Sequence, residues 1–207
     1  MADTPPVPES TAPVRRSEVE RRILDAALRL FAEHGFDGTS VQGIVAAAEV
    51  TKGALYHYFD SKDDLLYEIY HSLIARQLAD LGAVLARGLP PREAVRAVLT
   101  GLIRSTAEHI DEAKVFSRDK DRLDDARMRA VRADRRRYHT TFRGLVEQGQ
   151  REGVFGAATP AETVTIVALG MVNQMPSWYR PDGPKTAAQL ADEVAGFILD
   201  ALDQRRV

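Results

Sequence analysis

The stretch TSVQGIVAAAEVTKGALYHYFDSKDDLL, residues 39–66, decides the fold. Its pattern predicts two short helices joined by a tight corner, followed by the start of a third helix. The T-x-x-Q spacing of Thr39 and Gln42 is that of a capping box, which predicts that the first helix opens at Thr39. Thr51 and Ser61 can cap the next two helices, because each hydroxyl can accept a backbone N–H one turn in. The stretch is therefore predicted to be a helix-turn-helix.

The second helix of such a unit can enter a DNA major groove. Lys52 and Lys62 could neutralise phosphates, and Tyr56 and His57 could contact phosphate oxygens or base edges. The alternative is a three-helix packing module with no DNA partner, since helical corners are common. The predicted DNA-binding residues are Thr39, Ser40, Gln42, Thr51, Lys52, Gly53, Ala54, Tyr56, His57 and Lys62.

This stretch resembles the DNA-binding domain of the TetR family of bacterial repressors, over roughly residues 17–73. The matching residues include Gly35, Phe36, 39–41, Ile44, Ala47, 50–53, Leu55, Tyr56, Tyr58, Phe59 and 61–66. Glu49 stands where the family usually has Gly at the corner, and a left-handed backbone there costs a non-Gly residue about 1 kcal/mol. The resemblance implies a dimeric repressor that leaves its operator when a bound ligand moves its two DNA-binding domains apart.

The composition excludes several classes of protein. The 207 residues include no cysteine, so disulfides, thiolate catalysis and cysteine-based metal sites are ruled out. No apolar run reaches the length of a membrane span, and the N-terminus lacks the apolar region of a secretory signal. We therefore expect a cytoplasmic protein with no membrane partner. Phosphate loops and the H-E-x-x-H and G-x-S-x-G motifs are absent, so we expect no enzyme and no cofactor.

The charge balance does not by itself indicate nucleic-acid binding. The net charge is −2, and the stretch from Arg15 to Lys62 holds seven Lys or Arg against seven Asp or Glu. No acid lies between Val50 and Phe59, however, so the presented helix is locally basic. DNA binding should depend on a few local contacts and on a homodimer that doubles them.

Three regions are expected along the chain. Residues 1–16 are rich in proline and predict a disordered tail, whose Arg15 and Arg16 could reach a minor groove or phosphate or could simply be solvated. Residues 17–62 form the predicted helix-turn-helix domain, which begins with a Ser17-x-x-Glu20 capping box. Residues 63–207 form the predicted ligand-binding and dimerisation domain.

The chain is predicted to be all-α, an N-terminal three-helix unit followed by a helical bundle, with about nine helices. Their approximate ranges are 17–35, 39–48, 51–59, 61–87, 92–109, 110–116, 122–152, 161–178 and 186–204. The charge-dense segment 118–137 is either a solvated helix face or a mouth that attracts an anionic ligand. The family resemblance implies that the helices at 161–178 and 186–204 form the dimer interface.

A hydrophobic small-molecule effector is expected in the C-terminal part, because its helices mix bulky apolar residues with single polar ones. The predicted lining residues are Leu102, Thr106, Phe116, Met128, Tyr138, Phe142, Met171, Asn173, Gln174, Met175 and Trp178. The alternative for each of them is an ordinary packed core. The ligand is expected to be an acyl thioester first and a drug-like compound second, with any anionic end meeting the arginine-rich helix.

The segment 178–186 more loosely resembles the acyl-CoA-responsive branch of the family. Members that grip CoA are expected to have Arg and Trp where this chain has Leu169 and Asn173. Two rival classes remain: a DNA-binding protein without a small-molecule effector, and an all-α enzyme. Glu108, His109, Asp111 and Glu112 have metal-ligand side chains, but an exposed helix end is the favoured interpretation and no metal site is predicted.

Overall fold

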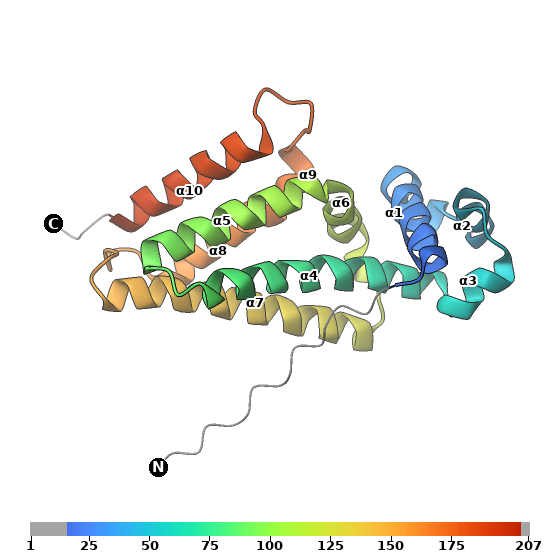
Figure 1. The fold of residues 1–207 in the computed structure, drawn as a ribbon, viewed down its shortest axis with the longest axis horizontal. Helices are drawn as coiled ribbons and strands as arrows, with labels where there is room; N and C mark the ends of the chain where they lie inside the picture. The colour runs from blue at the N-terminus through green and yellow to red at the C-terminus, as the bar shows by residue number, and fades with distance from the viewer. Residues whose placement is uncertain (1–15, 204–207) are drawn as a thin grey trace, which may run out of the picture.

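The computed structural model describes residues 16–203, and this part of the chain is built from α-helices without a strand. The predicted tail therefore lies outside the described residues, apart from Arg16. The helices, shown in Figure 1, are α1 (Glu18–Gly38), α2 (Val41–Ala48), α3 (Lys52–Tyr58), α4 (Lys62–Ala86), α5 (Pro91–Glu108), α6 (Ile110–Asp119), α7 (Asp125–Arg151), α8 (Ala161–Asn173), α9 (Met175–Trp178) and α10 (Ala187–Asp203), with a short 3-10 turn, η1 (Lys120–Arg122), after α6.

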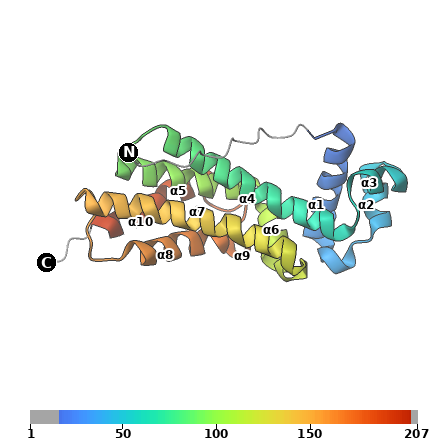
Figure 2. The ribbon, with the colours of Figure 1, turned by 90° about the horizontal axis from the view of Figure 1, so that it is seen from below.

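The molecule has two parts, which we call the head (α1–α3) and the bundle (α4–α10). The head lies at one end in Figure 1, and α4 runs from it along the whole bundle. Figure 2 shows α4 and α7 lying side by side along the length of the molecule. The long α4 therefore joins the two parts physically.

The core of the head is tightly filled. Phe31, Ile44, Leu55 and Leu65 are fully buried there, one from each of the helices α1 to α4. Residues of α6 and α7 complete this core, including the fully buried Val115. The domain boundary at residues 62–63 stays a prediction, and the packing of the head extends beyond it.

Most of the predicted helix caps are present. The Ser17–Glu20 capping box is formed, and the hydroxyls of Thr51 and Ser61 accept the amides of Ala54 and Asp64 at 3.1 Å each. The predicted cap at Thr39 is wrong by one residue, because Ser40 accepts from Gly43 N at 3.0 Å and begins α2. Thr39 is buried instead, and its hydroxyl donates to the carbonyls of Leu30 (3.1 Å) and Gly35 (2.8 Å).

The corner of the helix-turn-helix has a left-handed backbone, the conformation for which the TetR family usually has a glycine. Glu49 is in the left-handed region, at φ 52° and ψ 47°, although it is not a glycine. Arg22 donates to the carbonyls of Ala48 (2.6 Å) and Glu49 (3.1 Å), which satisfies acceptors left free where α2 ends. One arginine of α1 therefore holds the corner in place.

The bundle differs from the sequence expectation at two helix ends. The charge-dense segment 118–137 is divided between two helices. Helix α6 continues to Asp119, and a turn separates it from α7. Asp124 caps α7, because its side chain accepts from Arg127 N at 2.8 Å. The helix predicted at 161–178 ends at Asn173, and α9 follows separately. Pro176 explains the break, since it has no N–H to donate to the preceding turn. Ten α-helices result in the described residues, rather than about nine.

Candidate functional site

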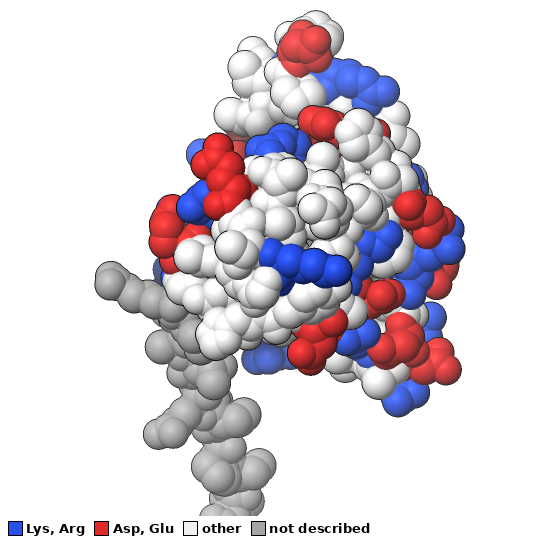
Figure 3. All heavy atoms as spheres, turned by 90° about the vertical axis from the view of Figure 1, so that its right-hand side faces the viewer, with Lys and Arg blue, Asp and Glu red and all other residues white. Residues whose placement is uncertain are grey.

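The exposed face of α3 holds most of the residues predicted to contact DNA. The exposed residues there are Thr51, Lys52, Gly53, Tyr56 and His57, with Ala54 partly exposed. Lys52 Nζ lies 5.8 Å from the centroid of the Tyr56 ring, so a cation and an aromatic ring are presented together. Figure 3 looks onto this end of the molecule and shows a largely uncharged surface with isolated basic side chains and acids toward its edges. Ser40 and Gln42 are also exposed, at the start of α2.

Two of the residues predicted to contact DNA instead form hydrogen bonds within the head. Thr39 is buried and bonded to α1, as described above. Lys62 Nζ donates to the carbonyls of Phe36 (2.7 Å) and Thr39 (2.9 Å) and lies 4.1 Å from the centroid of the Phe36 ring. Its ammonium therefore satisfies acceptors in the link from α1 to α2 instead of facing solvent, which corrects its predicted role as a phosphate contact.

The predicted N-terminal arm is only partly described. Arg15 lies outside the described residues. Arg16 donates to Glu68 (2.7 Å) and Ser72 (3.0 Å) of α4 and pairs with Glu20 at 3.4 Å. The Arg16 guanidinium is therefore bound along α4 in this structure, away from the exposed face of α3.

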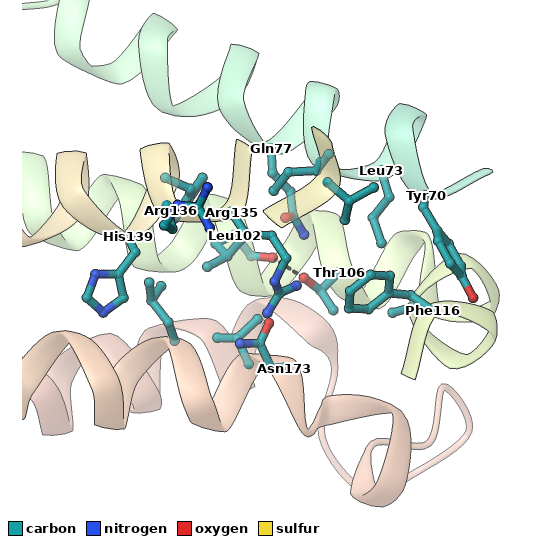
Figure 4. A pocket seen from close by; sticks show the side chains of 16 residues that line it. Tyr70, Leu73, Gln77, Leu102, Thr106, Phe116, Arg135, Arg136, His139 and Asn173 are labelled. Atoms are coloured by element: carbon teal, nitrogen blue, oxygen red, sulfur yellow. Dashed lines mark hydrogen bonds between the residues drawn. The ribbon is translucent and has the colours of Figure 1, made fainter. Parts of the chain in front are cut away.

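The bundle encloses a cavity of about 400 Å³. Its walls come from α4, α5, α6, α7 and α8, and they are mostly aliphatic and aromatic (Figure 4). No acidic side chain belongs to the wall. The lining residues are Tyr70, Leu73, Ile74, Gln77, Leu102, Thr106, Ala113, Phe116, Val131, Arg135, Arg136, Tyr138, His139, Leu169, Val172 and Asn173.

The structure brings together only some of the residues predicted to line a pocket. Those on the cavity wall are Leu102, Thr106, Phe116, Tyr138 and Asn173. Those elsewhere are Met128, Phe142, Met171, Gln174, Met175 and Trp178. Met128 packs into the core beneath the head, and Phe142 and Met175 are buried in the solid part of the bundle core. Gln174 and Trp178 are exposed, and neither belongs to the cavity wall.

Sequence analysis missed the contribution of α4 to the cavity and, on α7, those of Arg135 and Arg136. Tyr70, Leu73 and Ile74 lie on the buried face of α4, a helix that contributed none of the predicted lining residues. Arg135 and Arg136 lie in the charge-dense segment, where the anionic-mouth interpretation was the only signal pointing to them. The periodicity of a helix shows which face is buried but not what that face meets.

Arg135 is the most unusual group of the wall. It is half-buried, and its guanidinium carbon lies 4.9 Å from the centroid of the Phe116 ring. Burial lowers the pKa of Arg135, and no hydrogen bond or charge of the described residues offsets this effect. Burial likewise raises the pKa of the Tyr138 phenol above its usual value, with a smaller contribution from Asp80. Both groups are therefore partly shielded from water by the bundle.

Helices α4 and α6 connect the cavity wall to the head. Tyr70 and Phe116 pack edge to face with their ring centroids 4.9 Å apart, and the Tyr70 hydroxyl donates to Val115 O at 3.1 Å. Two residues after Phe116, Arg118 donates to the carbonyl of Phe31 in α1. An ion pair between Arg122 and Asp37 adds a further contact to the end of α1. The same short segment thus contacts both the cavity and the head.

A second exposed surface is apolar. Phe197 of α10 keeps 67% of its surface, and Ile166 and Val167 of α8 keep 56% and 51%. Large apolar side chains in such numbers on two helices are typical of an interaction surface. These are the helices predicted to form the dimer interface.

The residues once considered as metal ligands have other partners. Glu112 pairs with Arg76, and Asp111 pairs with Lys114 at 2.8 Å. Within residues 16–203 no group of three or more potential ligands is gathered. None of the helices described is both long and apolar enough to span a membrane.

Comparisons with known proteins agree with this architecture. Residues 23–69 match the model of the family described as bacterial regulatory proteins, tetR family, and residues 88–202 match that of the tetracyclin repressor-like C-terminal domain. The chain is 28% identical over 200 residues to the HTH-type transcriptional repressor KstR2 of Rhodococcus jostii, covering 96% of this chain and 97% of the relative.

Two solved structures share the fold. The TetR family regulator PfmR from Thermus thermophilus has a TM-score of 0.81 at 31% identity, covering 88% of this chain and 100% of PfmR. AibR in complex with isovaleryl coenzyme A and operator DNA has a TM-score of 0.77 at 26% identity, covering 87% of this chain and 97% of AibR.

The fold and the exposed α3 define a helix-turn-helix regulator with a C-terminal helical bundle. Because the C-terminal family model alone matches more than half of the chain, this protein belongs to the TetR family of DNA-binding transcriptional regulators. Its relatives are regulators of transcription.

Proposed function

We propose that this chain is a transcriptional repressor that binds operator DNA as a homodimer and leaves the DNA when a hydrophobic small molecule enters the cavity. The observation that carries the proposal is that α4 and α6 line the cavity and also contact the head. A ligand that binds one arrangement of these helices more tightly would shift the position of the head. Because operator DNA lies in the bacterial cytoplasm, the protein would act there.

The mechanical link is short. Phe116 forms part of the cavity wall, and Arg118 on the same helix holds the carbonyl of Phe31 in α1. A small rotation of α6 around a ligand would move this anchor. The heads of a dimer would then no longer be spaced to fit two successive major grooves on one face of the DNA. The AibR structure supports the ligand-binding and DNA-binding parts of the proposal, since a relative of the same fold was solved in complex with isovaleryl coenzyme A and operator DNA.

For the DNA-binding surface, we propose Ser40, Gln42, Thr51, Lys52, Gly53, Ala54, Tyr56 and His57. Lys52→Ala and Tyr56→Ala should each weaken operator binding by about 1–3 kcal/mol without changing the stability of the protein. Fluorescence anisotropy with an operator selected from a random duplex pool would measure the loss. Lys185→Ala, which removes an exposed lysine from the loop between α9 and α10, outside the head, is the control. Unchanged affinity in both α3 variants would refute the surface.

For the dimer, we propose the apolar surface formed by Ile166, Val167 and Phe197. A charge placed at its centre would be buried without a partner, so Phe197→Asp should give a monomer with little operator affinity. Light scattering at micromolar concentration would measure the mass. Leu85→Asp, at an exposed apolar position near the end of α4, should remain dimeric. A monomeric wild-type protein would contradict this part of the proposal.

For the effector, a panel of acyl-CoAs, free fatty acids and hydrophobic drugs can be screened for thermal stabilisation and for release of the operator. A ligand at a hundred times its dissociation constant should add about 2.7 kcal/mol to the free energy of unfolding. If no compound both stabilises the protein and releases the DNA, the chain is a regulator without a small-molecule effector.

A further inference from the structure

The cavity wall has a charge pattern that narrows the chemistry of its ligand. Apolar side chains from five helices make up most of the wall, and none of its members is acidic. Its basic members are Arg135, Arg136 and His139, all on α7. Arg136 is exposed, and His139 lies 3.7 Å from a carboxylate oxygen of Glu162. Of the three basic residues, Arg135 is therefore the one that lies inside the cavity and has no acidic residue beside it on the wall.

The side chain of Arg135 is held in position to meet a ligand. Figure 4 shows it extending from α7 across the cavity, with its guanidinium close to Thr106 and Asn173. The Phe116 ring supports the guanidinium from one side, at 4.9 Å. Thr106 already donates its hydroxyl to Leu102 O at 2.7 Å, so it has no proton left to offer an anion. The amides of Asn173 and Gln77 are among the further donors on the wall.

An unpaired cation in such a place destabilises the empty protein. Removing a guanidinium from water without a partner is unfavourable, and this cost is the reason that burial lowers the Arg135 pKa. An anion bound beside it would recover the lost solvation, and the low dielectric of the apolar wall would strengthen their attraction. The planar fork of an arginine also matches the two oxygens of a carboxylate, which gives the contact direction as well as energy.

We propose that the effector is a compact hydrophobic carboxylate, whose anionic group binds the guanidinium of Arg135 and the amide of Asn173. This inference rests on the proposed function, because it assigns the ligand class of the same cavity. The apolar part of the ligand then lies among Leu73, Ile74 and Leu102, where the wall has no charge. The cavity volume of about 400 Å³ is toward the small end of the range for ligand sites, roughly 300–1,000 Å³.

A whole CoA thioester fits this site less well. CoA has several phosphate charges, and each would need a basic group or water around it. The cavity interior offers one uncompensated cation. A single carboxylate matches that charge, whereas a neutral compound would leave Arg135 unpaired.

The test compares acids with their esters. Decanoate and 1-naphthylacetate, each against its methyl ester, and decanoyl-CoA would be titrated into the full-length protein by calorimetry and thermal shift. The variants are Arg135→Gln, Arg135→Lys and, as a control, Arg132→Gln, which removes an exposed arginine of the same helix. We expect at least one carboxylate to bind the wild type and Arg132→Gln at least tenfold more tightly than its ester.

In Arg135→Gln this preference should disappear, because the carboxylate affinity falls at least tenfold while the ester affinity is unchanged. Arg135→Lys should keep part of the preference for the carboxylate, since lysine has the positive charge but lacks the planar guanidinium that can bind both carboxylate oxygens. The proposal is wrong if neither carboxylate binds more tightly than its ester, or if Arg135→Gln keeps the full preference.

Release of operator DNA separates this inference from the function on which it rests. If decanoyl-CoA or a neutral ester releases DNA while neither carboxylate binds, the effector mechanism stands and the ligand class is wrong. If a carboxylate binds through Arg135 and the operator stays bound, the ligand class is right and the release mechanism is wrong.

Discussion

The head and the cavity each hold a half-buried basic side chain that lies against a phenylalanine ring. In the head, Lys62 Nζ is 4.1 Å from the centroid of the Phe36 ring and donates to two carbonyls. In the cavity, Arg135 is 4.9 Å from the centroid of the Phe116 ring, and burial alone shifts its pKa. The two cations look alike in exposure and in aromatic contact. They differ in their hydrogen bonds: the Lys62 ammonium already donates to two backbone carbonyls, whereas the Arg135 guanidinium has no such partner among the described residues. Lys62 therefore has a structural role, and Arg135 is a candidate ligand contact.

Replacing Lys62 with methionine should have the largest effect. Lys62→Met removes the charged donor from the carbonyls of Phe36 and Thr39, and such bonds contribute about 1.5–3 kcal/mol each. Water can reach part of this site, so we expect a loss of about 2–3 kcal/mol in the free energy of unfolding. Urea denaturation followed by circular dichroism would measure it.

The same variant tests the corrected role of Lys62. Operator affinity, measured on the folded fraction at low temperature, should stay close to that of the wild type. A large loss of operator affinity with unchanged stability would show instead that Lys62 contacts a phosphate, and the comparison with Arg135 would fail.

Replacing Arg135 with methionine should have a smaller effect of the opposite sign. Arg135→Met removes an unpaired, half-buried charge and keeps an apolar chain of similar reach, and substitutions of this kind are often neutral or stabilising. The lost contact with the Phe116 ring offsets part of the gain. We expect the ligand-free protein to be unchanged or more stable by up to about 1 kcal/mol in urea. A loss as large as that of Lys62→Met would mean that Arg135 has a partner in the empty protein.

The smallest effect is expected at the corner that Arg22 holds. Glu49 occupies the left-handed region at φ 52°, which costs a non-Gly residue about 1–2 kcal/mol. Glu49→Gly relieves this strain but adds about 0.4–1 kcal/mol of backbone entropy to the unfolded state. The net gain should be about 0.5 kcal/mol, visible as a higher melting temperature. The Arg22–Glu49 ion pair is exposed and long, at 3.4 Å, so its removal should change little. A less stable variant would show that the side chain of Glu49 matters more than its backbone.

The sequence by itself determined the features that depend on near neighbours in the chain. The apolar stripes at 3.6-residue spacing gave the long helices, and the hydroxyls of Ser17, Thr51 and Ser61 gave their starts, because a cap bonds to an amide only three residues away. At Thr186 the hydroxyl likewise accepts from Gln189 N, at 3.2 Å, at the start of the last predicted helix.

Only the tertiary structure decided which buried residues meet empty space and which meet each other. Phe142 and Tyr138 lie one turn apart on α7, yet Phe142 is packed in the solid core while Tyr138 lines the cavity. Thr39 and Ser40 are adjacent, yet Ser40 and not Thr39 caps α2. The fold brings the carbonyls of Leu30 and Gly35 to the Thr39 hydroxyl, which donates to them instead. Likewise, the sequence placed Arg135 in a charged run without showing that it would line a cavity whose wall has no carboxylate. The physical reason is that helical periodicity fixes the direction of a side chain relative to its own helix, whereas packing between helices distant in sequence fixes what lies in that direction.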